Sequence, residues 1–342
     1  MSYILIKKPG LLTTIQDAGR YGYQKYGVSP SGTMDLLSLK WANIIVGNNI
    51  DEGVLEMTYF GDEILFNVNT IITITGADMQ PKLNGKDIPM YSRININIGD
   101  TLKFSNAVNG LRTYLSVYGG FNIEKIMDSK STYIKYNIGG YKGRRLKAGD
   151  KIYLNEKNIR AFQGKPVYIK NKALNIGIIR VIVGPDFYEF EDKSRKDFFE
   201  KEYEITESSD RMGYRLKGEK IIHKKSPDII SRGLPIGAIQ VSGDNQPIIM
   251  MSDRQTIGGY TVIGVVVSVD INKLAQMKPG DRVRFEKISL ESAHSLLMKE
   301  EKELRELKEN FQEDKPYISN DIKNFNVEVN GEIFNVSLED NN

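Results

Sequence analysis

A short pattern of glycine, aspartate and alternating apolar residues recurs in this chain and constrains its fold more than any other feature. The pattern is Gly-Asp-x-aliphatic-x-Phe/Leu, and its four copies occupy residues 61–66, 99–104, 149–154 and 280–285. Glycine adopts the positive φ of a tight turn, aspartate accepts hydrogen bonds from nearby backbone donors, and the alternating apolar side chains point inward. Each copy therefore predicts a turn that leads into a strand. The unequal spacing of the copies excludes a solenoid and favours a barrel-rich architecture.

Much of the rest of the chain also has the signature of short strands. Runs rich in Ile, Val, Tyr and Thr, each bounded by Gly, Asp, Asn or Pro, occupy residues 71–75, 112–117, 178–183, 238–241, 248–251 and 262–269. Helices do not alternate regularly with these runs, so a doubly wound parallel sheet is not expected. We predict a mainly β protein with two barrel-like subdomains.

Three segments have helical character, and the chain ends in a hairpin pattern. Residues 34–46 predict a buried helix, residues 195–201 a short connector and residues 290–311 an amphipathic helix with Ser289 as its N-cap. The last helix is expected to dock on the second barrel or to project in part; the alternative is a helix that docks a partner. Residues 324–340 alternate around Asn330-Gly331, which is typical of a type I′ hairpin.

These patterns divide the chain into three parts. We expect a β-rich subdomain over residues 1–175, a barrel subdomain with its terminal helix over 176–312, and a linker with a hairpin tail over 313–342. The chain has no cysteine and two histidines, which excludes disulfides, thiolate nucleophiles and Cys-ligated metals. Its net charge of +3 gives no reason to expect nucleic-acid binding. No export signal or membrane-spanning run is visible, so we expect a cytoplasmic protein without a membrane partner.

A glycine-rich stretch over residues 13–35 ends where the first helix is predicted to begin. Helix N-termini present free N–H groups to anions, so Arg20, Ser31 and Gly32 are candidates to bind a carboxylate or phosphate. The stretch lacks the Gly-Lys-Ser/Thr of a Walker P-loop and the pattern of a Rossmann fingerprint. The alternative interpretation is a helix-entry turn capped by serine and aspartate.

Two later stretches combine turn residues with groups that bind planar polar ligands. Arg211 and Arg215 lie beside Asp210 and suit bidentate recognition of a carboxylate or phosphate; the alternative is a surface turn with an internal Asp–Arg pair. Farther along, amides, carboxylates and glycines flank two apolar strands. Side-chain amides match the edges of ureido and lactam groups, and the candidates there are Gln240, Asp244, Gln246, Asp253, Gln255, Gly258 and Gly259. The alternative is a set of ordinary turns between strands. Neither His223 nor His294 belongs to a catalytic or metal-ligand pattern.

Seven motifs in order along the chain resemble one known family. They include Thr14-Ile15-Gln16-Asp17-x-Gly19-Arg20, Ser31-Gly32-x-Met34-Asp35, Ser209-Asp210-Arg211-Met212-Gly213, Gly237-Ala238-Ile239-Gln240-Val241 and Asp253-Arg254-Gln255-Thr256-x-Gly258-Gly259-Tyr260. The chain resembles the biotin-dependent carboxyltransferase family, also called allophanate hydrolase subunit 2, over about residues 3–310. That family includes KipA-like proteins, the PxpC-like C subunit of 5-oxoprolinase and part of urea carboxylase.

The resemblance implies a cyclophilin-like β-barrel and an enzyme component that is active only with partners. The first hypothesis is the C subunit of an ATP-dependent 5-oxoprolinase, which opens 5-oxo-L-proline to L-glutamate with a KipI/PxpB-like subunit and a PxpA-like subunit. ATP would bind at or with the partner. Arg20, Arg211 and Arg215 would then stabilise developing negative charge, Asp244 or Asp253 would position water or take a proton, and Gln240 and Gln255 would hold the amide edge.

Two alternatives remain open on the sequence. The first is a biotin-dependent carboxyltransferase subunit of the urea carboxylase type, and the second is a KipA-like antagonist of a histidine-kinase inhibitor. The chain has Ser242 and Asn245 where family members commonly have proline and glycine; asparagine also tolerates positive φ, so we expect the turn to survive. The tail resembles the opening hairpin of a biotin carrier domain. The chain has no Met-Lys-Met biotinylation site, so covalent biotin is not expected on it.

Overall fold

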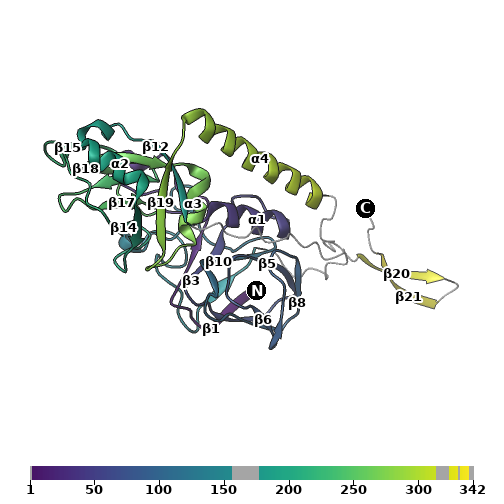
Figure 1. Ribbon diagram of the computed structural model, residues 1–342. Coiled ribbons are helices and arrows are strands. Elements are labelled where there is room, and N and C mark those ends of the chain that lie inside the picture. Colours follow the sequence, from purple (N-terminus) through teal and green to yellow (C-terminus); the bar gives the residue numbers. More distant parts are fainter. Residues whose placement is uncertain (1, 156–176, 313–322, 330–331, 339–342) are drawn as a thin grey trace.

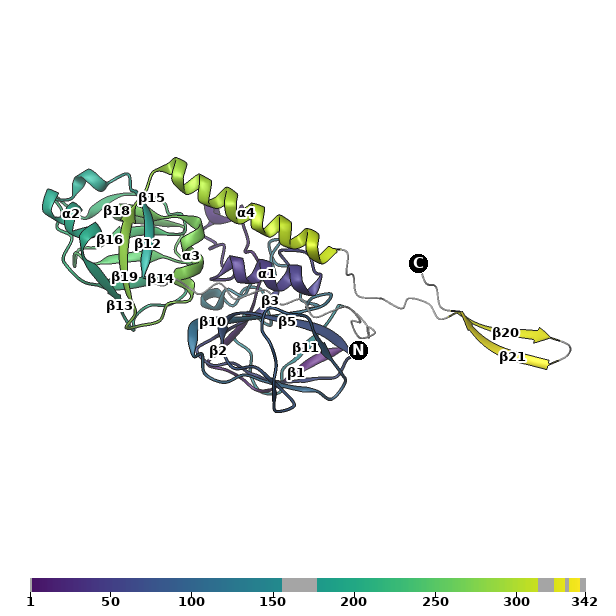
Figure 2. The same cartoon turned by 45° about the vertical axis from the view of Figure 1, so that its right-hand side comes forward.

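The computed structural model describes residues 2–155 and 177–312, together with two further strands over 323–329 and 332–338. The described chain forms two β-rich lobes side by side, with one long helix lying along both and a hairpin beyond it (Figures 1 and 2). The expected domain boundary at residue 175 lies outside the described residues. No helix within the described ranges is both long and apolar enough to cross a lipid bilayer.

The N-terminal lobe consists of two antiparallel sheets around a common apolar core. The six-stranded sheet has the order β11-β1-β4-β9-β6-β7 and the five-stranded sheet the order β2-β3-β10-β5-β8. Inward-facing isoleucines, leucines and phenylalanines of both sheets fill the core between them. The strands are β1 Tyr3–Lys8, β2 Leu12–Gln16, β3 Val54–Thr58, β4 Glu63–Phe66, β5 Thr70–Asp78, β6 Lys82–Leu83, β7 Lys86–Asp87, β8 Ile94–Ile96, β9 Thr101–Lys103, β10 Asn109–Val117 and β11 Lys151–Tyr153.

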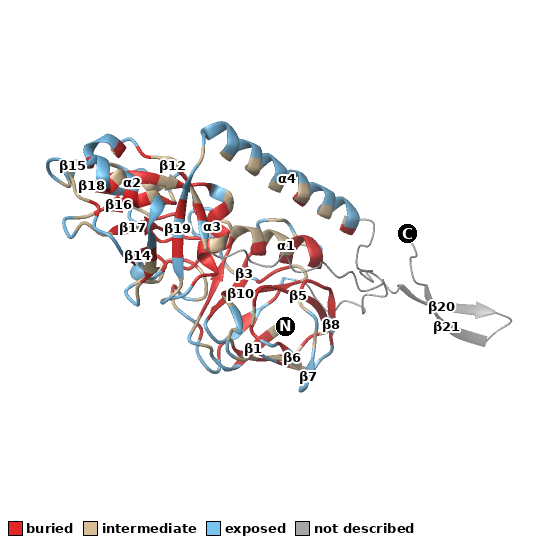
Figure 3. Ribbon diagram, viewed as in Figure 1, coloured by how far each residue is buried: buried red, intermediate tan, exposed pale blue. Residues whose placement is uncertain are grey.

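The C-terminal lobe is a closed barrel. Its ring runs β12-β19-β13-β14-β17-β16-β18 and closes through the pairing of β18 with β12, while β15 extends the sheet beyond β18. Burial follows the strands of this ring, as Figure 3 shows. The predicted mainly β, barrel-containing fold is therefore confirmed. The strands are β12 Ile178–Val183, β13 Glu202–Ile205, β14 Gly213–Lys217, β15 Asp228–Gly233, β16 Ala238–Val241, β17 Pro247–Met250, β18 Ile257–Val266 and β19 Arg282–Lys287.

All four copies of the Gly-Asp pattern lead into strands, but they use two kinds of turn. In three copies, Asp100, Asp150 and Asp281 accept a hydrogen bond from the N–H three residues earlier, at 2.7, 2.8 and 2.9 Å. The glycines before them have φ of 92°, 86° and 90°. In the fourth copy, Asp62 is buried and instead accepts from the N–H of Gly10 and the hydroxyl of Thr13. Through these two hydrogen bonds, Asp62 connects the start of β4 to the segment that leads into β2.

Four α-helices complete the described fold: α1 Leu36–Val46, α2 Asp192–Glu200, α3 Ser268–Ala275 and α4 Leu290–Gln312. Asp35 is the N-cap of α1, and Ser289 caps α4 through a 3.2 Å bond from the N–H of Ser292. The predicted strand over 262–269 is wrong at its end, because β18 stops at Val266 and α3 begins at Ser268. The C-terminal strands β20 Lys323–Val329 and β21 Glu332–Leu338 form the predicted hairpin, whose turn lies outside the described residues.

Helix α4 connects the two lobes rather than docking on the barrel alone. It contacts α3 beside the barrel and α1 on the N-terminal lobe. Leu304 and Phe311 are buried against Ile44, Ile45 and Tyr91. Its opposite face is exposed along most of its length (Figure 3). The expectation of a helix docked on the second barrel describes only its contact with α3, because the apolar stripe of its second half packs on α1 of the other lobe.

Candidate functional site

Two neighbouring pockets share a wall formed by the turn before β14. One pocket, here called the interlobe pocket, has a volume of about 630 Å³ and is lined by both lobes, for example by Leu111 and Met277. The other, here called the barrel pocket, has a volume of about 380 Å³ and lies on the barrel. Asp210 and Met212 line both pockets. Predicted candidate residues from two separate stretches of sequence, 208–216 and 237–260, therefore line one region.

The barrel pocket gathers the amides expected to recognise a planar ligand. Gln240 on β16, Gln255 before β18 and Arg215 on β14 all line it. Gln240 is buried and donates a 3.2 Å hydrogen bond from Nε2 to the carbonyl of Tyr260, whereas Gln255 and Arg215 are exposed. A guanidinium and a side-chain amide at the surface of one pocket can bind a carboxylate and an amide of the same small ligand.

Gly258 creates the space in which these amides meet. A Cβ at this position would lie 2.7 Å from Nε2 of Gln240 and 3.1 Å from Nε2 of Gln255. Both distances are shorter than ordinary van der Waals contacts, so any larger residue would push the amides apart. Gly259 has a looser environment, because its Cβ would lie 3.3 Å from the hydroxyl of Ser231. Of the two predicted glycines, only Gly258 is in close contact with both amides.

Arg211 lies on the other side of the shared wall, in a buried ion network between the lobes. Its Nε and Nη2 donate to the two carboxylate oxygens of Asp253 at 2.9 and 3.0 Å, and Nη1 donates to Glu56. Its Nη2 also donates to the carbonyl of Gly32 at 2.6 Å. Burial alone would lower the pKa of Arg211, but the carboxylates of Asp253 and Glu56 outweigh burial and raise that pKa. Arg211 thus stays charged and binds protein groups from both lobes.

Further polar contacts hold the lobes together around this network. Glu56 on β3 also accepts a 2.7 Å bond from the N–H of Met34. Gln276, just after α3, accepts from the N–H groups of Leu111 and Arg112 and donates to Asp35 at 2.8 Å. Glu56, Arg112 and Gln276 were not predicted from the sequence. A glutamate in the middle of the apolar run 54–58 was the one available signal, because buried charges require partners.

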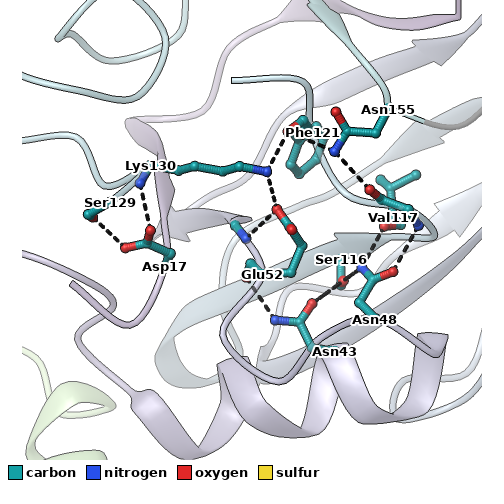
Figure 4. A network of polar contacts seen from close by, with 12 residues as sticks. Asp17, Asn43, Asn48, Glu52, Ser116, Val117, Phe121, Ser129, Lys130 and Asn155 are labelled. Atoms are coloured by element: carbon teal, nitrogen blue, oxygen red, sulfur yellow. Dashed lines mark hydrogen bonds and ion pairs between the residues drawn. The ribbon is translucent and has the colours of Figure 1, made fainter. Parts of the chain in front are cut away.

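The glycine-rich stretch wraps around a second buried polar centre. Asp17 accepts hydrogen bonds from the hydroxyls of Ser129 and Ser131 and from the N–H groups of Gly19 and Lys130, part of which Figure 4 shows. Nearby, Lys130 forms an ion pair with Glu52. These contacts fix segment 126–135, whose last residues, 133–135, line the interlobe pocket.

Arg20 fixes the same segment from the opposite side. Its side chain is fully buried and donates to the carbonyls of Ile126 and Ser131, at 3.4 and 2.5 Å. Burial lowers the pKa of Arg20 despite the charges of Asp17 and Asp253. The stretch therefore does not present Arg20 to solvent as an anion-binding loop would. The helix-entry interpretation describes it better, with Asp35 as the cap.

The remaining predicted residues lie apart from the amide cluster. Ser31 is buried between the lobes with φ of 53°. Asp244 and Gln246 occupy the β16–β17 turn, where Asp244 accepts from the hydroxyl of Ser242 and Gln246 pairs with the backbone of Gly218. Neither lines the interlobe pocket or the barrel pocket. In the described part of the chain, no group of three or more His, Cys, Asp and Glu side chains could hold a metal ion.

Comparisons with known proteins identify a family model and several chains that are similar to this one. A family model described as the carboxyltransferase domain, subdomains A and B, matches residues 26–287. The chain is 33% identical to the 5-oxoprolinase C subunit of Escherichia coli (strain K12), over 84% of this chain and 92% of that protein. It is 36% identical to urea amidolyase of Saccharomyces cerevisiae, over 86% of this chain and 17% of that protein.

Solved structures show the same fold. The crystal structure of the K. lactis urea amidolyase superposes with a TM-score of 0.82 at 30% identity, covering 89% of this chain and 20% of that one. The protein TTHA0988 superposes with a TM-score of 0.75 at 26% identity, covering 84% of this chain and 55% of that one. The chain thus spans about a fifth of the urea amidolyase structure that it matches.

Proposed function

Since this chain belongs to the family of carboxyltransferase domains with subdomains A and B, we propose that it is the C subunit of an ATP-dependent 5-oxoprolinase. The complex would open 5-oxo-L-proline to L-glutamate together with a KipI/PxpB-like subunit and a PxpA-like subunit. Support comes from the relatives that are C subunits of 5-oxoprolinase, which this chain matches over 92% of the length of the Escherichia coli protein. In this proposal ATP binds at or with the partner subunit, and its hydrolysis supplies the free energy for opening the lactam.

The observation that carries this proposal is the amide cluster of the barrel pocket. A lactam presents a carbonyl acceptor beside an N–H donor, and a primary amide presents the complementary pair. In the proposed binding mode, Gln240 and Gln255 hold the lactam edge, and Arg215 binds the carboxylate of 5-oxoproline. Gly258 keeps the space between the two glutamines open. The volume of about 380 Å³ suits a ligand of this small size.

Arg211 and Asp253 take a positioning role in this proposal. Both oxygens of Asp253 accept from Arg211, and Arg211 also binds Glu56 and Gly32. An ion pair engaged in this way orients the wall shared by the two pockets. Arg20 acts in the same manner by fixing segment 126–135. Direct contact with the substrate is assigned to Arg215, Gln240 and Gln255 instead.

The test is a reconstitution. The purified chain is mixed with the KipI/PxpB-like and PxpA-like subunits, and glutamate release from 5-oxoproline is measured with and without ATP. We expect ATP-dependent release that requires all three chains. Arg215→Met should then raise the KM for 5-oxoproline, while Lys217→Met, an exposed neighbour on β14 that does not line the pocket, should leave KM unchanged. Absence of release from an assembled complex would refute the proposal.

A second candidate function follows from the urea amidolyase relatives. The structural match to the K. lactis enzyme supports a carboxyltransferase role, in which the same amide pair would hold the N–C=O unit of urea. Replacing 5-oxoproline by urea, bicarbonate and a biotinylated carrier in the same assay distinguishes the two. A KipA-like regulatory role predicts a tight complex with the KipI-like chain. In that case Arg215→Met should leave the antagonism of the kinase inhibitor unchanged.

A further inference from the structure

We propose that the interlobe pocket is a second ligand site, separate from the barrel pocket, that binds an amphipathic carboxylic acid with its carboxylate on Arg112 and its apolar body along the pocket wall. This site goes beyond the proposed function and does not require it. Three observations carry the proposal: the apolar wall, an unsatisfied donor on a buried arginine, and the balance of charges around the pocket.

The wall of the interlobe pocket is mostly apolar. Both lobes contribute to it, and the apolar lining side chains include Leu11, Leu111, Ile134, Ile205, Met212 and Met277. A volume of about 630 Å³ falls within the range of small-molecule sites. Leu11 is 45% exposed at this wall, so the pocket is reached from solvent beside it. Such a wall favours a ligand with an extended alkyl or aryl body.

Arg112 supplies the polar anchor. This residue on β10 lines the pocket and is only 4% exposed. Its Nη1 donates to the hydroxyl of Tyr214 at 2.7 Å and to the carbonyl of Ala275 at 2.6 Å. Its Nε finds no acceptor among the described residues. A buried donor without an acceptor is unfavourable, and a carboxylate oxygen is the acceptor that an arginine binds most strongly.

The charges around the pocket also favour an anion. Four basic side chains line it, Arg112, Lys135, Arg145 and Arg211, against three acidic ones, Glu207, Asp210 and Asp253. Arg211 and Asp253 pair with each other, and Asp210 accepts from the N–H groups of Met212 and Gly213, which leaves Arg112, Lys135 and Arg145 against Glu207. Lys135 and Arg145 are exposed, and they extend the positive potential outward. A cation or an uncharged ligand would not benefit from this field.

The test uses two methionines of the pocket wall as reporters. The full chain is labelled with ¹³C-methyl methionine and titrated with sodium octanoate, 1-octanol and sodium acetate. Met277 lines the interlobe pocket alone and Met212 lines both pockets, whereas Met298 on α4 is 49% exposed, lines neither pocket and serves as the internal control. We expect octanoate to shift Met212 and Met277 saturably and at least about tenfold more tightly than octanol, which lacks the charge, or acetate, which lacks the body.

Two variants locate the ligand. Leu11→Trp narrows the pocket without altering its charges and should weaken octanoate binding by about tenfold or more. Ile230→Trp, at a 94% exposed position on the barrel outside the pocket, is the matched control and should bind as wild type does. Arg112→Lys, which keeps the charge but removes the Nε donor, should reduce the preference for octanoate over octanol. Equal affinity for octanoate and octanol, equal shifts at Met298, or unchanged binding in Leu11→Trp would each overturn the proposal.

Discussion

The buried network between the lobes and the pocket on the barrel each contain an arginine, and the two arginines are suited to different tasks. Arg211 and Arg215 are four residues apart, yet Arg211 is 6% exposed and bound by two carboxylates, whereas Arg215 is exposed at the edge of the barrel pocket. The side chain of one arginine orients two lobes, and that of the other is available to a ligand. Burial and the presence of partners, rather than residue type, separate the structural arginine from the exposed arginine that we propose to bind a ligand.

This comparison predicts that breaking the network affects stability first. Glu56→Ala would leave Arg211 with one carboxylate fewer in a buried site and remove the acceptor for the N–H of Met34. We expect a loss of about 3–5 kcal/mol in the free energy of unfolding, measured by urea denaturation. Glu202→Ala is the control, because its pair with Arg282 is more than half exposed and should contribute below about 1 kcal/mol. Equal losses in both variants would contradict the prediction.

Glu56 is paired and should stabilise the folded protein, whereas a buried carboxylate without a basic partner should destabilise it when ionised. Burial raises the pKa of Asp62 from 3.8 to about 6, and no basic side chain contributes to its shift. A raised carboxyl pKa means that the folded state holds the proton more tightly, so the contribution of Asp62 to stability is most favourable at low pH and is lost as pH rises from about 4 to about 6. Asp62→Asn should remove this loss and stabilise the protein by about 3 kcal/mol at pH 7.

The measurement is the difference in unfolding free energy between Asp62→Asn and wild type from pH 3.5 to pH 8. Taking the difference cancels the contribution of Glu300, whose pKa burial also raises, to about 7. Asparagine retains the acceptor oxygen for the N–H of Gly10 and the hydroxyl of Thr13. A difference that does not change with pH would show that Asp62 is ionised and satisfied in the folded protein.

The exposed pocket should be more sensitive in function than in stability. Gly258→Ala would place a methyl group 2.5 Å from Cδ1 of Leu234 and 2.7 Å from Nε2 of Gln240. We expect a stability loss of about 1–3 kcal/mol from this crowding and a loss of activity in the reconstituted complex. Gly259→Ala is the matched control, because its nearest neighbour lies at 3.3 Å. Full activity in Gly258→Ala would argue against the amide pair as the substrate contact.

The smallest effect is expected from Gln255→Ala. Gln255 is exposed in the barrel pocket, so its removal should leave the unfolding free energy unchanged. One lost hydrogen bond to substrate corresponds to about a tenfold decrease in kcat/KM. Gln246→Ala should do the opposite and lower the unfolding free energy while leaving kcat/KM unchanged. Gln246 pairs with the backbone of Gly218 and lines neither pocket. A change in the activity of Gln246→Ala alone would reverse the assignment of the two glutamines.

The sequence by itself determined the local parts of this protein. The Gly-Asp turns, the barrel strands and the last helix were predicted because positive φ, strand alternation and helical periodicity are properties of a few neighbouring residues. The cluster of Gln240, Gln255 and Gly258 was also within reach, because Gln240 lies on β16 while Gln255 and Gly258 lie just before and at the start of β18, which pairs with β16.

Only the tertiary structure decided which of the charged candidates are free to meet a ligand. The partners of Arg211 lie far from it in sequence: Glu56 is 155 residues away and Gly32 is 179 residues away. Arg20 likewise donates to a carbonyl 111 residues away. No local pattern encodes such pairs. Whether a buried charge is neutralised depends on which distant groups the packing of the two lobes brings within hydrogen-bonding distance, and that is a property of the whole fold.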